Sequence, residues 1–261
     1  MTAWRGLAFS TLGCPGESVP EVLAHAAVGG CAGVELRCRA GELITPDQSD
    51  ESARAVGDAL RAGGLDPICV ASYVQIGSPD AGVPEELERH LQIAAAVGAS
   101  AVRVFGGDPD DPDVHARAVD RLRGAAAASM ETGVAILLET HDAFLDGRSV
   151  ARVLDAASVP SAGAIWDVLN PWRAGEEPST TARHLEPWLR HVQIKDAASA
   201  TDLSPLLAGS GAVPLAEILD LLRASGYREW VSLEWEAAWF PDALPLDAAL
   251  TAFRRLLDDA A

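Results

Sequence analysis

The sequence is poor in cysteine, in long apolar runs and in positive charge. Its 261 residues include four cysteines, Cys14, Cys31, Cys38 and Cys69, without the close spacing of a zinc knuckle. A chain of this length needs no disulfide framework, so we expect reduced thiols and a cytoplasmic protein. No run of about 18 apolar residues occurs, and the first five residues lack a signal-peptide pattern. These absences argue against export and against a membrane partner.

Acidic residues greatly outnumber basic ones. The chain has 38 Asp and Glu against 20 Lys and Arg, which gives a formal net charge of −18. Such a field repels phosphate backbones, so we expect no nucleic-acid partner. Net charge does not describe a single cleft, however, and a locally basic pocket for a small anion stays open.

Short apolar runs alternate with longer stretches of helical period along the whole chain. The alternation predicts repeated strand–helix units around a parallel sheet. Eight units in about 260 residues are typical of a single (β/α)8 TIM barrel, here one α/β domain over residues 1–261. A doubly wound sheet is the alternative, but the first turn, Ser10–Gly13, lacks its glycine-rich fingerprint. The predicted strands are Leu7–Ser10, Gly33–Arg37, Pro67–Ser72, Ala101–Phe105, Ala135–Thr140, Gly163–Val168, His191–Asp196 and Val231–Trp235.

Acidic residues stand at the ends of three late strands. Glu139, Asp167 and Glu234 each follow an apolar run, and the carboxyl ends of barrel strands meet at one mouth. Three carboxylates in one apolar-lined mouth repel one another unless a cation or shared protons neutralise them. Any one of them alone is better explained as a solvated loop acid or a helix cap. Together they predict a divalent-metal site.

Several motifs in the same order resemble the xylose isomerase-like barrels, a family that includes sugar phosphate isomerases, ketose 3-epimerases and inosose dehydratases. The resemblance spans essentially the whole chain and implies a TIM barrel. It is strongest in Leu138–His141, Trp166–Pro171, His191–Asp196 and Gly226–Glu234, with softer matches at Gly33–Leu36 and Val102–Gly107.

The resemblance implies a metal held by Glu139, Asp167, Gln193 and Glu234. The third position departs from the family, which has histidine there, and His191 lies two residues earlier in this chain. Asn170 likewise stands where many relatives have histidine. A glutamine carbonyl completes a set of oxygen ligands, so we expect Mn²⁺ or Mg²⁺ as the cofactor rather than Zn²⁺.

The implied activity is isomerisation or epimerisation of a sugar, sugar phosphate or cyclitol. Proton transfer next to a carbonyl would pass through an enediolate, with Glu139 and Glu234 as the acid and base. Two alternatives stay open: a lyase similar to inosose dehydratase, and a sugar-binding barrel without activity. Abasic-site endonucleases share the fold but need histidines on early strands, whereas His25 and His90 fall in helical stretches.

Five further residues are expected to bind a small polyhydroxy carbonyl substrate. The resemblance assigns Glu35 and Arg103 to substrate hydroxyls, although an Arg–Glu pair at the rim explains them equally well. His141 is two residues past Glu139 and is a candidate donor to a substrate oxygen, or a histidine satisfied at the rim. Lys195 either steadies the enolate or pairs with a nearby carboxylate such as Asp196. Asn170 completes this set, and a homodimer is left open.

Overall fold

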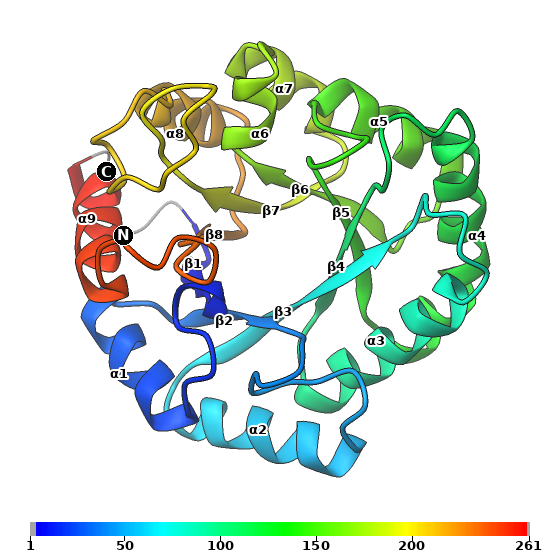
Figure 1. The fold of residues 1–261 in the computed structure, drawn as a ribbon, viewed down its shortest axis with the longest axis horizontal. Coiled ribbons are helices and arrows are strands. Elements are labelled where there is room, and N and C mark those ends of the chain that lie inside the picture. The colour runs from blue at the N-terminus through cyan, green and yellow to red at the C-terminus, as the bar shows by residue number, and fades with distance from the viewer. Residues whose placement is uncertain (1–3, 260–261) are drawn as a thin grey trace.

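The protein forms a closed barrel of eight parallel strands in sequence order. A computed structural model describes residues 4–259, so both ends of the predicted domain, residues 1–3 and 260–261, lie outside the described residues. Figure 1 looks down the barrel and shows the strands surrounded by helices. The TIM-barrel prediction is confirmed. The strands are β1 Gly6–Ser10, β2 Gly33–Arg37, β3 Asp66–Gln75, β4 Ala101–Phe105, β5 Ala135–Glu139, β6 Ala162–Asp167, β7 Leu189–Ile194 and β8 Trp230–Leu233.

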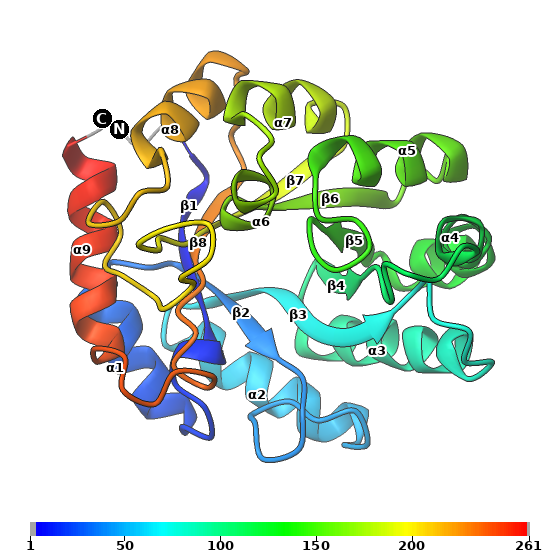
Figure 2. The same ribbon diagram turned by 45° about the horizontal axis from the view of Figure 1, so that its top comes forward.

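Helices cover the outside of the barrel, and Figure 2 shows α9 completing the ring beside α1. The α1 helix begins directly after Ser18, whose backbone N–H donates to the Glu21 carboxylate at 2.7 Å. Within residues 4–259, no helix has the length and apolar character needed to cross a membrane. The helices are η1 Thr11–Gly13, α1 Val19–Gly29, α2 Asp50–Ala62, α3 Val83–Val97, α4 Val114–Thr132, α5 Gly147–Ala157, α6 Leu169–Arg173, α7 Pro178–Leu185, α8 Leu215–Ala224 and α9 Leu246–Asp259.

The apolar core has two parts, one on each side of the sheet. The larger part fills the space between strands and helices, and the apolar faces of α8 and α9 belong to it. The smaller part lies inside the barrel and includes Cys69, Leu137, Ile165 and Trp230. Because side chains alternate along a strand, Glu139 follows Leu137, and Asp167 follows Ile165, on the inner side. The inner core thus supports the polar layer above it.

Only β2 and β4 match the predicted bounds at both ends, and the differences that bear on the site are those of β7 and β8. The β7 strand begins at Leu189 and ends at Ile194, and β8 ends at Leu233, so Lys195, Asp196 and Glu234 follow the strands directly. The β7 strand begins early because Leu189 pairs with Ala164 of β6. Its end is fixed by Asp196, whose carboxylate accepts backbone N–H groups from Gly209, Gly211 and Val213. These hydrogen bonds hold the segment after β7 in place, and the Lys195 side chain extends toward the barrel mouth.

The two histidines expected in helices lie there. His25 is in α1 and contacts the carboxylates of Glu17 and Asp247 at 2.9 and 2.5 Å. His90 is buried in α3, with Nδ1 2.7 Å from the Glu86 carbonyl. Neither ring lies on a strand, which agrees with the argument against a three-zinc endonuclease centre.

Candidate active site

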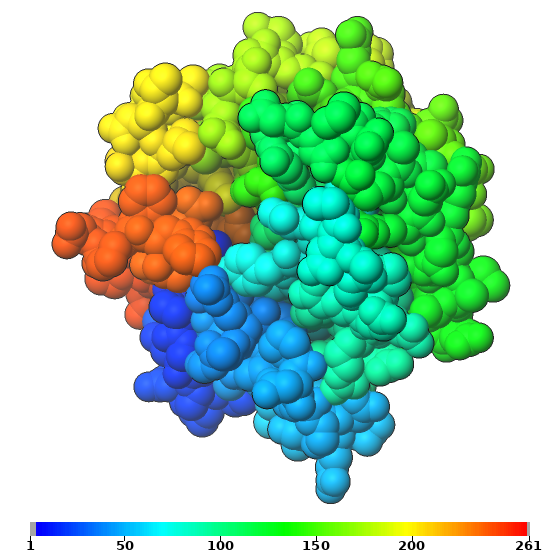
Figure 3. Space-filling model, turned by 45° about the vertical axis from the view of Figure 1, so that its right-hand side comes forward, coloured from blue at the N-terminus to red at the C-terminus, as the bar shows by residue number. Residues whose placement is uncertain are grey.

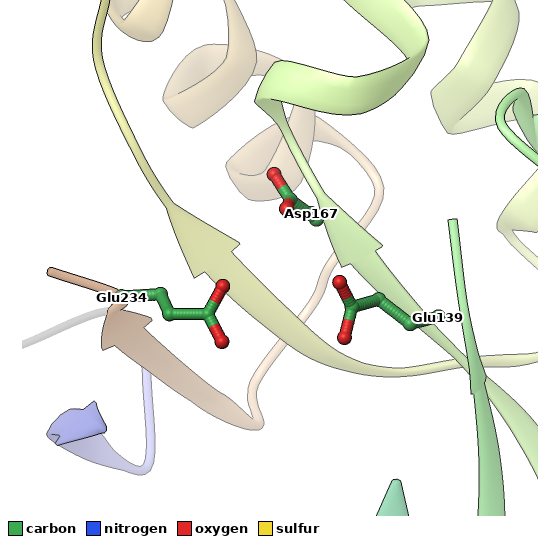
Figure 4. A group of neighbouring side chains, drawn as sticks. All are labelled: Glu139, Asp167 and Glu234. Carbon is green, nitrogen blue, oxygen red and sulfur yellow. The ribbon is translucent and has the colours of Figure 1, made fainter. Parts of the chain in front are cut away.

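Three carboxylates converge at the carboxyl ends of β5, β6 and β8. Figure 4 shows Glu139 and Glu234 pointing toward each other across the barrel, with Asp167 beside them. One oxygen from each lies within 4.8 Å of the others, and all three side chains are buried. The prediction that these residues meet at one mouth is therefore matched by the geometry.

Two basic side chains contact the carboxylates. Arg103 Nη1 lies 3.3 Å from Glu139 and 3.2 Å from Glu234. Lys195 Nζ lies 2.8 Å from Asp167 and 2.5 Å from Glu234. The expected rim pair of Arg103 with Glu35 is not formed, because Arg103 is turned toward Glu139 and Glu234. Lys195 also does not pair with Asp196, whose carboxylate is taken up by backbone N–H groups.

Two of the three carboxylates, Glu139 and Glu234, are destabilised as anions. Burial raises the pKa of Glu139 to about 8, with repulsion from Glu234 and Asp167 adding to the effect and Arg103 opposing it. Burial also raises the pKa of Glu234, against the attraction of Lys195 and Arg103. Two basic residues thus do not neutralise the cluster fully. A further positive charge, from a proton or a bound cation, would stabilise it.

This pKa shift predicts a pH dependence of stability for the protein stripped of metal. Between about pH 4.5 and 8, Glu139 holds a proton in the folded protein and loses it on unfolding. Its contribution to the free energy of unfolding therefore falls as pH rises through that window. Chemical denaturation at several pH values in the presence of a chelator should therefore show wild type losing stability relative to Glu139→Gln as pH rises. A difference in the free energy of unfolding between the two proteins that stays constant with pH would contradict the raised pKa of Glu139.

Gln193 lies on β7 beside Asp167 and is fully buried. Its Nε2 donates to Glu35 at 2.8 Å and to Glu234 at 3.3 Å. Among the described residues, its Oε1 has no hydrogen-bond partner. An unsatisfied buried acceptor costs roughly 1–3 kcal/mol, so a missing partner is expected there. The unpaired Gln193 oxygen, on the strand beside Asp167, is a candidate fourth donor next to the three carboxylates, and four hard oxygen donors would suit a divalent cation.

Glu35 lies beneath this cluster and has no exposed surface. Ser232 Oγ donates to its Oε1, His191 Nε2 lies 3.1 Å from the same oxygen, and Gln193 occupies Oε2. Burial opposes ionisation, but His191 and the Ser232 hydrogen bond lower the pKa of Glu35 to about 2. A carboxylate enclosed by three protein partners has no free oxygen for a substrate. The predicted substrate contact of Glu35 is therefore not supported by the geometry.

His141 and Asn170 also lie near the carboxylates, each with protein partners. The His141 ring packs on Phe105 with centroids 4.5 Å apart, and its Nδ1 lies 2.6 Å from Asp142. Burial works against protonation, but Asp142 and Glu139 raise the pKa of His141. Asn170 Nδ2 donates to Asp167 at 2.8 Å. Asn170 thus orients a carboxylate, whereas His141 is half-buried at the mouth.

One acidic partner of the site was missed from the sequence. Glu236 lies 2.8 Å from Lys195 Nζ, and this contact lowers its pKa although burial opposes the change. Glu236 follows Glu234 by two residues, the spacing that places side chains on one face of an extended segment. That spacing was the signal available in the sequence.

A basic and aromatic cluster at the same barrel end was also missed. We call Arg37, Arg39, Tyr73 and Trp239 the arginine rim. The Arg39 guanidinium carbon lies 5.4 Å from the Tyr73 ring centroid and 6.0 Å from that of Trp239. Tyr73 also contacts Arg103, at 5.6 Å. Figure 3 shows the segment before α9, in orange, against the blue N-terminal segments, which is where this cluster forms.

Within the rim, only Arg39 offers an uncommitted charge. Arg37 is buried, pairs with Glu42 at 2.7 Å and donates to the Tyr73 hydroxyl at 2.7 Å. Arg39 is exposed and has no acidic partner among residues 4–259. The Tyr73 ring contacts both Arg39 and Arg103, and Arg103 lies within 3.3 Å of two of the central carboxylates. An anion bound near Arg39 would therefore lie at the mouth of the site.

The fold and this set of carboxylates define a class of barrel proteins, and sequence comparison identifies the family. The model of the xylose isomerase-like TIM barrel family matches residues 23–256. The chain belongs to this family, as its motifs predicted.

Two curated relatives carry different enzyme names. A Streptomyces coelicolor protein, provisionally named hydroxypyruvate isomerase, is 28% identical over 249 residues, covering 84% of this chain and 86% of its own. The 3-dehydroshikimate dehydratase of Bacillus anthracis is 23% identical over 266 residues, covering 92% and 93%. The solved structure of the IOLI protein with a bound zinc atom has a TM-score of 0.82 at 15% identity, covering 98% of both chains. The family thus contains isomerases and a dehydratase.

Proposed function

We propose that this protein is a metal-dependent isomerase that moves a proton at the carbon next to a carbonyl group. The observation that carries the proposal is the convergence of Glu139, Asp167 and Glu234 at one buried point. Burying three acids is unfavourable without a charge to balance them, and binding energy for a cation explains the arrangement. The substrate would be a small polyhydroxy carbonyl compound.

The three carboxylates and Gln193 would hold the cation. When bound, a divalent ion polarises the substrate carbonyl and acidifies the neighbouring C–H bond. Because all four donors are oxygens, we propose Mn²⁺ or Mg²⁺. Asn170 would keep Asp167 oriented through its hydrogen bond.

The proton transfers are assigned to Glu139 and Glu234. They face each other across the site, so one would remove a proton from the substrate and the other would return one. A pKa raised toward neutrality suits Glu139 to this exchange. The enediolate formed by proton removal carries negative charge, which the Lys195 ammonium and the Arg103 guanidinium would stabilise.

We further propose that the substrate carries a carboxylate bound by Arg39. The exposed Arg39 guanidinium has no acidic partner among residues 4–259, and it contacts the same Tyr73 ring that Arg103 contacts. Hydroxypyruvate and 3-dehydroshikimate, the compounds named in the two curated relatives, are both carboxylates. Hydroxypyruvate is thus the first substrate to test.

Arg39→Ala is expected to raise KM for hydroxypyruvate at least tenfold while changing kcat less, because it removes a charge that only positions the substrate. Steady-state kinetics with Mn²⁺ would measure this effect. Arg54→Ala is the matched control, since Arg54 is exposed on α2 and has no ion pair among residues 4–259. An unchanged KM in Arg39→Ala would refute the role of Arg39.

A dehydratase is the second candidate, favoured by His141. Its raised pKa makes it a proton donor at the barrel mouth, as elimination of a hydroxyl group requires. Incubating the protein and Mn²⁺ with hydroxypyruvate, 3-dehydroshikimate and simple ketoses distinguishes the two candidates. An isomer of unchanged mass supports the isomerase, and loss of one water from the substrate supports the dehydratase.

A further inference from the structure

The proposed ligand Gln193 differs from the carboxylates in one chemical respect. An amide group has one end that can bind a cation and one end that cannot, so a glutamine ligand works only if its oxygen faces the ion. Carboxylate oxygens have no such restriction. Some neighbour must therefore determine which end of the Gln193 amide faces the centre.

Glu35 is the neighbour placed to do this. Its Oε2 accepts a hydrogen bond from Gln193 Nε2 at 2.8 Å, the shorter of the two bonds made by that nitrogen. Its Oε1 is occupied separately, by the Ser232 hydroxyl and by His191 Nε2 at 3.1 Å. Glu35 is wholly enclosed, so it cannot turn toward solvent. Its carboxylate presents an acceptor to Gln193 and selects the NH₂ end of the amide.

The other end of the amide is left unpaired. Gln193 Oε1 is buried and has no hydrogen-bond partner among residues 4–259. The Gln193 backbone is in register with Asp167, one of the three central carboxylates. We propose that Glu35 is a positioning residue that fixes the Gln193 amide with its oxygen as the donor for the divalent cation. This inference rests on the metal centre proposed above.

This arrangement explains why Glu35 and Gln193 are buried together. Partners of a metal ligand commonly fix its orientation, and removing them lowers metal affinity about 10- to 100-fold. Glu35 would act in this way on an amide, which needs orienting more than a carboxylate does. Ser232 and His191 would hold Glu35 in turn, since they occupy its other oxygen.

The test is Mn²⁺ affinity of the chelator-treated protein, measured by electron paramagnetic resonance of free Mn²⁺, together with thermal unfolding. In Glu35→Gln, the oxygen held by Ser232 stays an acceptor and the group facing Gln193 becomes a donor. The Gln193 amide should then turn over, so that its NH₂ group takes the place of the oxygen that is unpaired in the wild-type protein. We expect Mn²⁺ affinity to fall at least tenfold, with little change in the unfolding temperature of the metal-free protein.

Two further variants separate orientation from general damage. The double variant Glu35→Gln with Gln193→Glu exchanges donor and acceptor at constant net charge, and it offers an oxygen in either orientation. We expect it to recover wild-type affinity or better, even if Glu35→Gln folds poorly. Glu229→Gln makes the same change of acid to amide at the surface, beside Arg5, and should leave Mn²⁺ affinity unchanged.

Different results would overturn the role of Glu35 and the metal centre itself. Wild-type affinity in Glu35→Gln, or a folded double variant that does not recover binding, would overturn the role of Glu35 while leaving the centre intact. A wild-type protein that binds neither Mn²⁺ nor Mg²⁺ would overturn the metal centre, and the inference with it.

Discussion

Glu139→Gln and Glu234→Gln are each expected to lower kcat by about 10²- to 10⁴-fold, the usual contribution of a general acid or base. The amide keeps the shape of the side chain and one oxygen for the cation, but it cannot carry a proton. Because Glu139 is destabilised as an anion by burial, Glu139→Gln should not lower the stability of the metal-free protein near neutral pH. Activity should therefore fall much more than the unfolding temperature.

Kinetics and thermal unfolding of the two variants measure this directly. The control is Glu229→Gln. It removes an acidic side chain close to Glu234 in the sequence whose partner, Arg5, lies at the surface. Rates within tenfold of wild type in both site variants would refute the proton-transfer roles. An active Glu234→Gln beside an inactive Glu139→Gln would indicate a single base, which favours one-base isomerisation or elimination over two-base epimerisation.

Gln193→His is expected to shift metal preference from Mn²⁺ and Mg²⁺ toward Zn²⁺ or Co²⁺, with tighter retention. An imidazole nitrogen suits these ions better than an amide oxygen does. Glu35 would still accept a hydrogen bond from the other ring nitrogen, so the ring would be oriented as the amide is. We expect Zn²⁺ affinity to increase by about tenfold or more.

Metal analysis of the purified proteins and competition between Zn²⁺ and Mn²⁺ provide the measurement. Gln193→Leu serves as a control, because it leaves an apolar side chain of similar bulk without any donor atom and should weaken binding of every ion. Tight zinc binding by the wild-type protein would contradict the argument from oxygen ligands.

The fold was predictable because each strand carries its own signal. Apolar runs such as Gly33–Arg37 and Ala101–Phe105 match β2 and β4 at both ends. The predicted strand bounds were wrong where pairing with a neighbouring strand, rather than local composition, sets the end of the strand. The β3 strand continues to Gln75 because that residue pairs with Phe105 after a shift in register. Similarly, β7 begins at Leu189 because β6 offers it a partner, which no local pattern indicates.

The position of the site was predictable, but the contacts within it were only partly so. Glu139, Asp167 and Glu234 end the apolar runs of β5, β6 and β8, and barrel geometry brings such residues together. Whether Glu35 faces substrate or protein depends on Ser232, 197 residues later in the chain, and on His191, about 156 residues later. The position of Glu35 at a strand end does not reveal that its carboxylate is buried against these two side chains.

The arginine rim shows the same limit at the surface. Arg39 lies in the segment after β2, Tyr73 in β3, and Trp239 in the segment before α9. Their contacts depend on how two segments fold over the barrel end, so no motif marks them. The sequence permitted only the general statement that a local basic pocket is compatible with a strongly acidic chain.

The central claim is proton transfer next to a carbonyl at the Glu139 and Glu234 carboxylates. Its most direct test is incorporation of solvent deuterium, followed by nuclear magnetic resonance, with hydroxypyruvate in D₂O and Mn²⁺ present. We predict enzyme-dependent exchange at the carbon next to the carbonyl in wild type, reduced at least 100-fold in Glu139→Gln. Absence of enzyme-dependent exchange with hydroxypyruvate, 3-dehydroshikimate and a panel of ketoses would contradict the account and favour a binding protein.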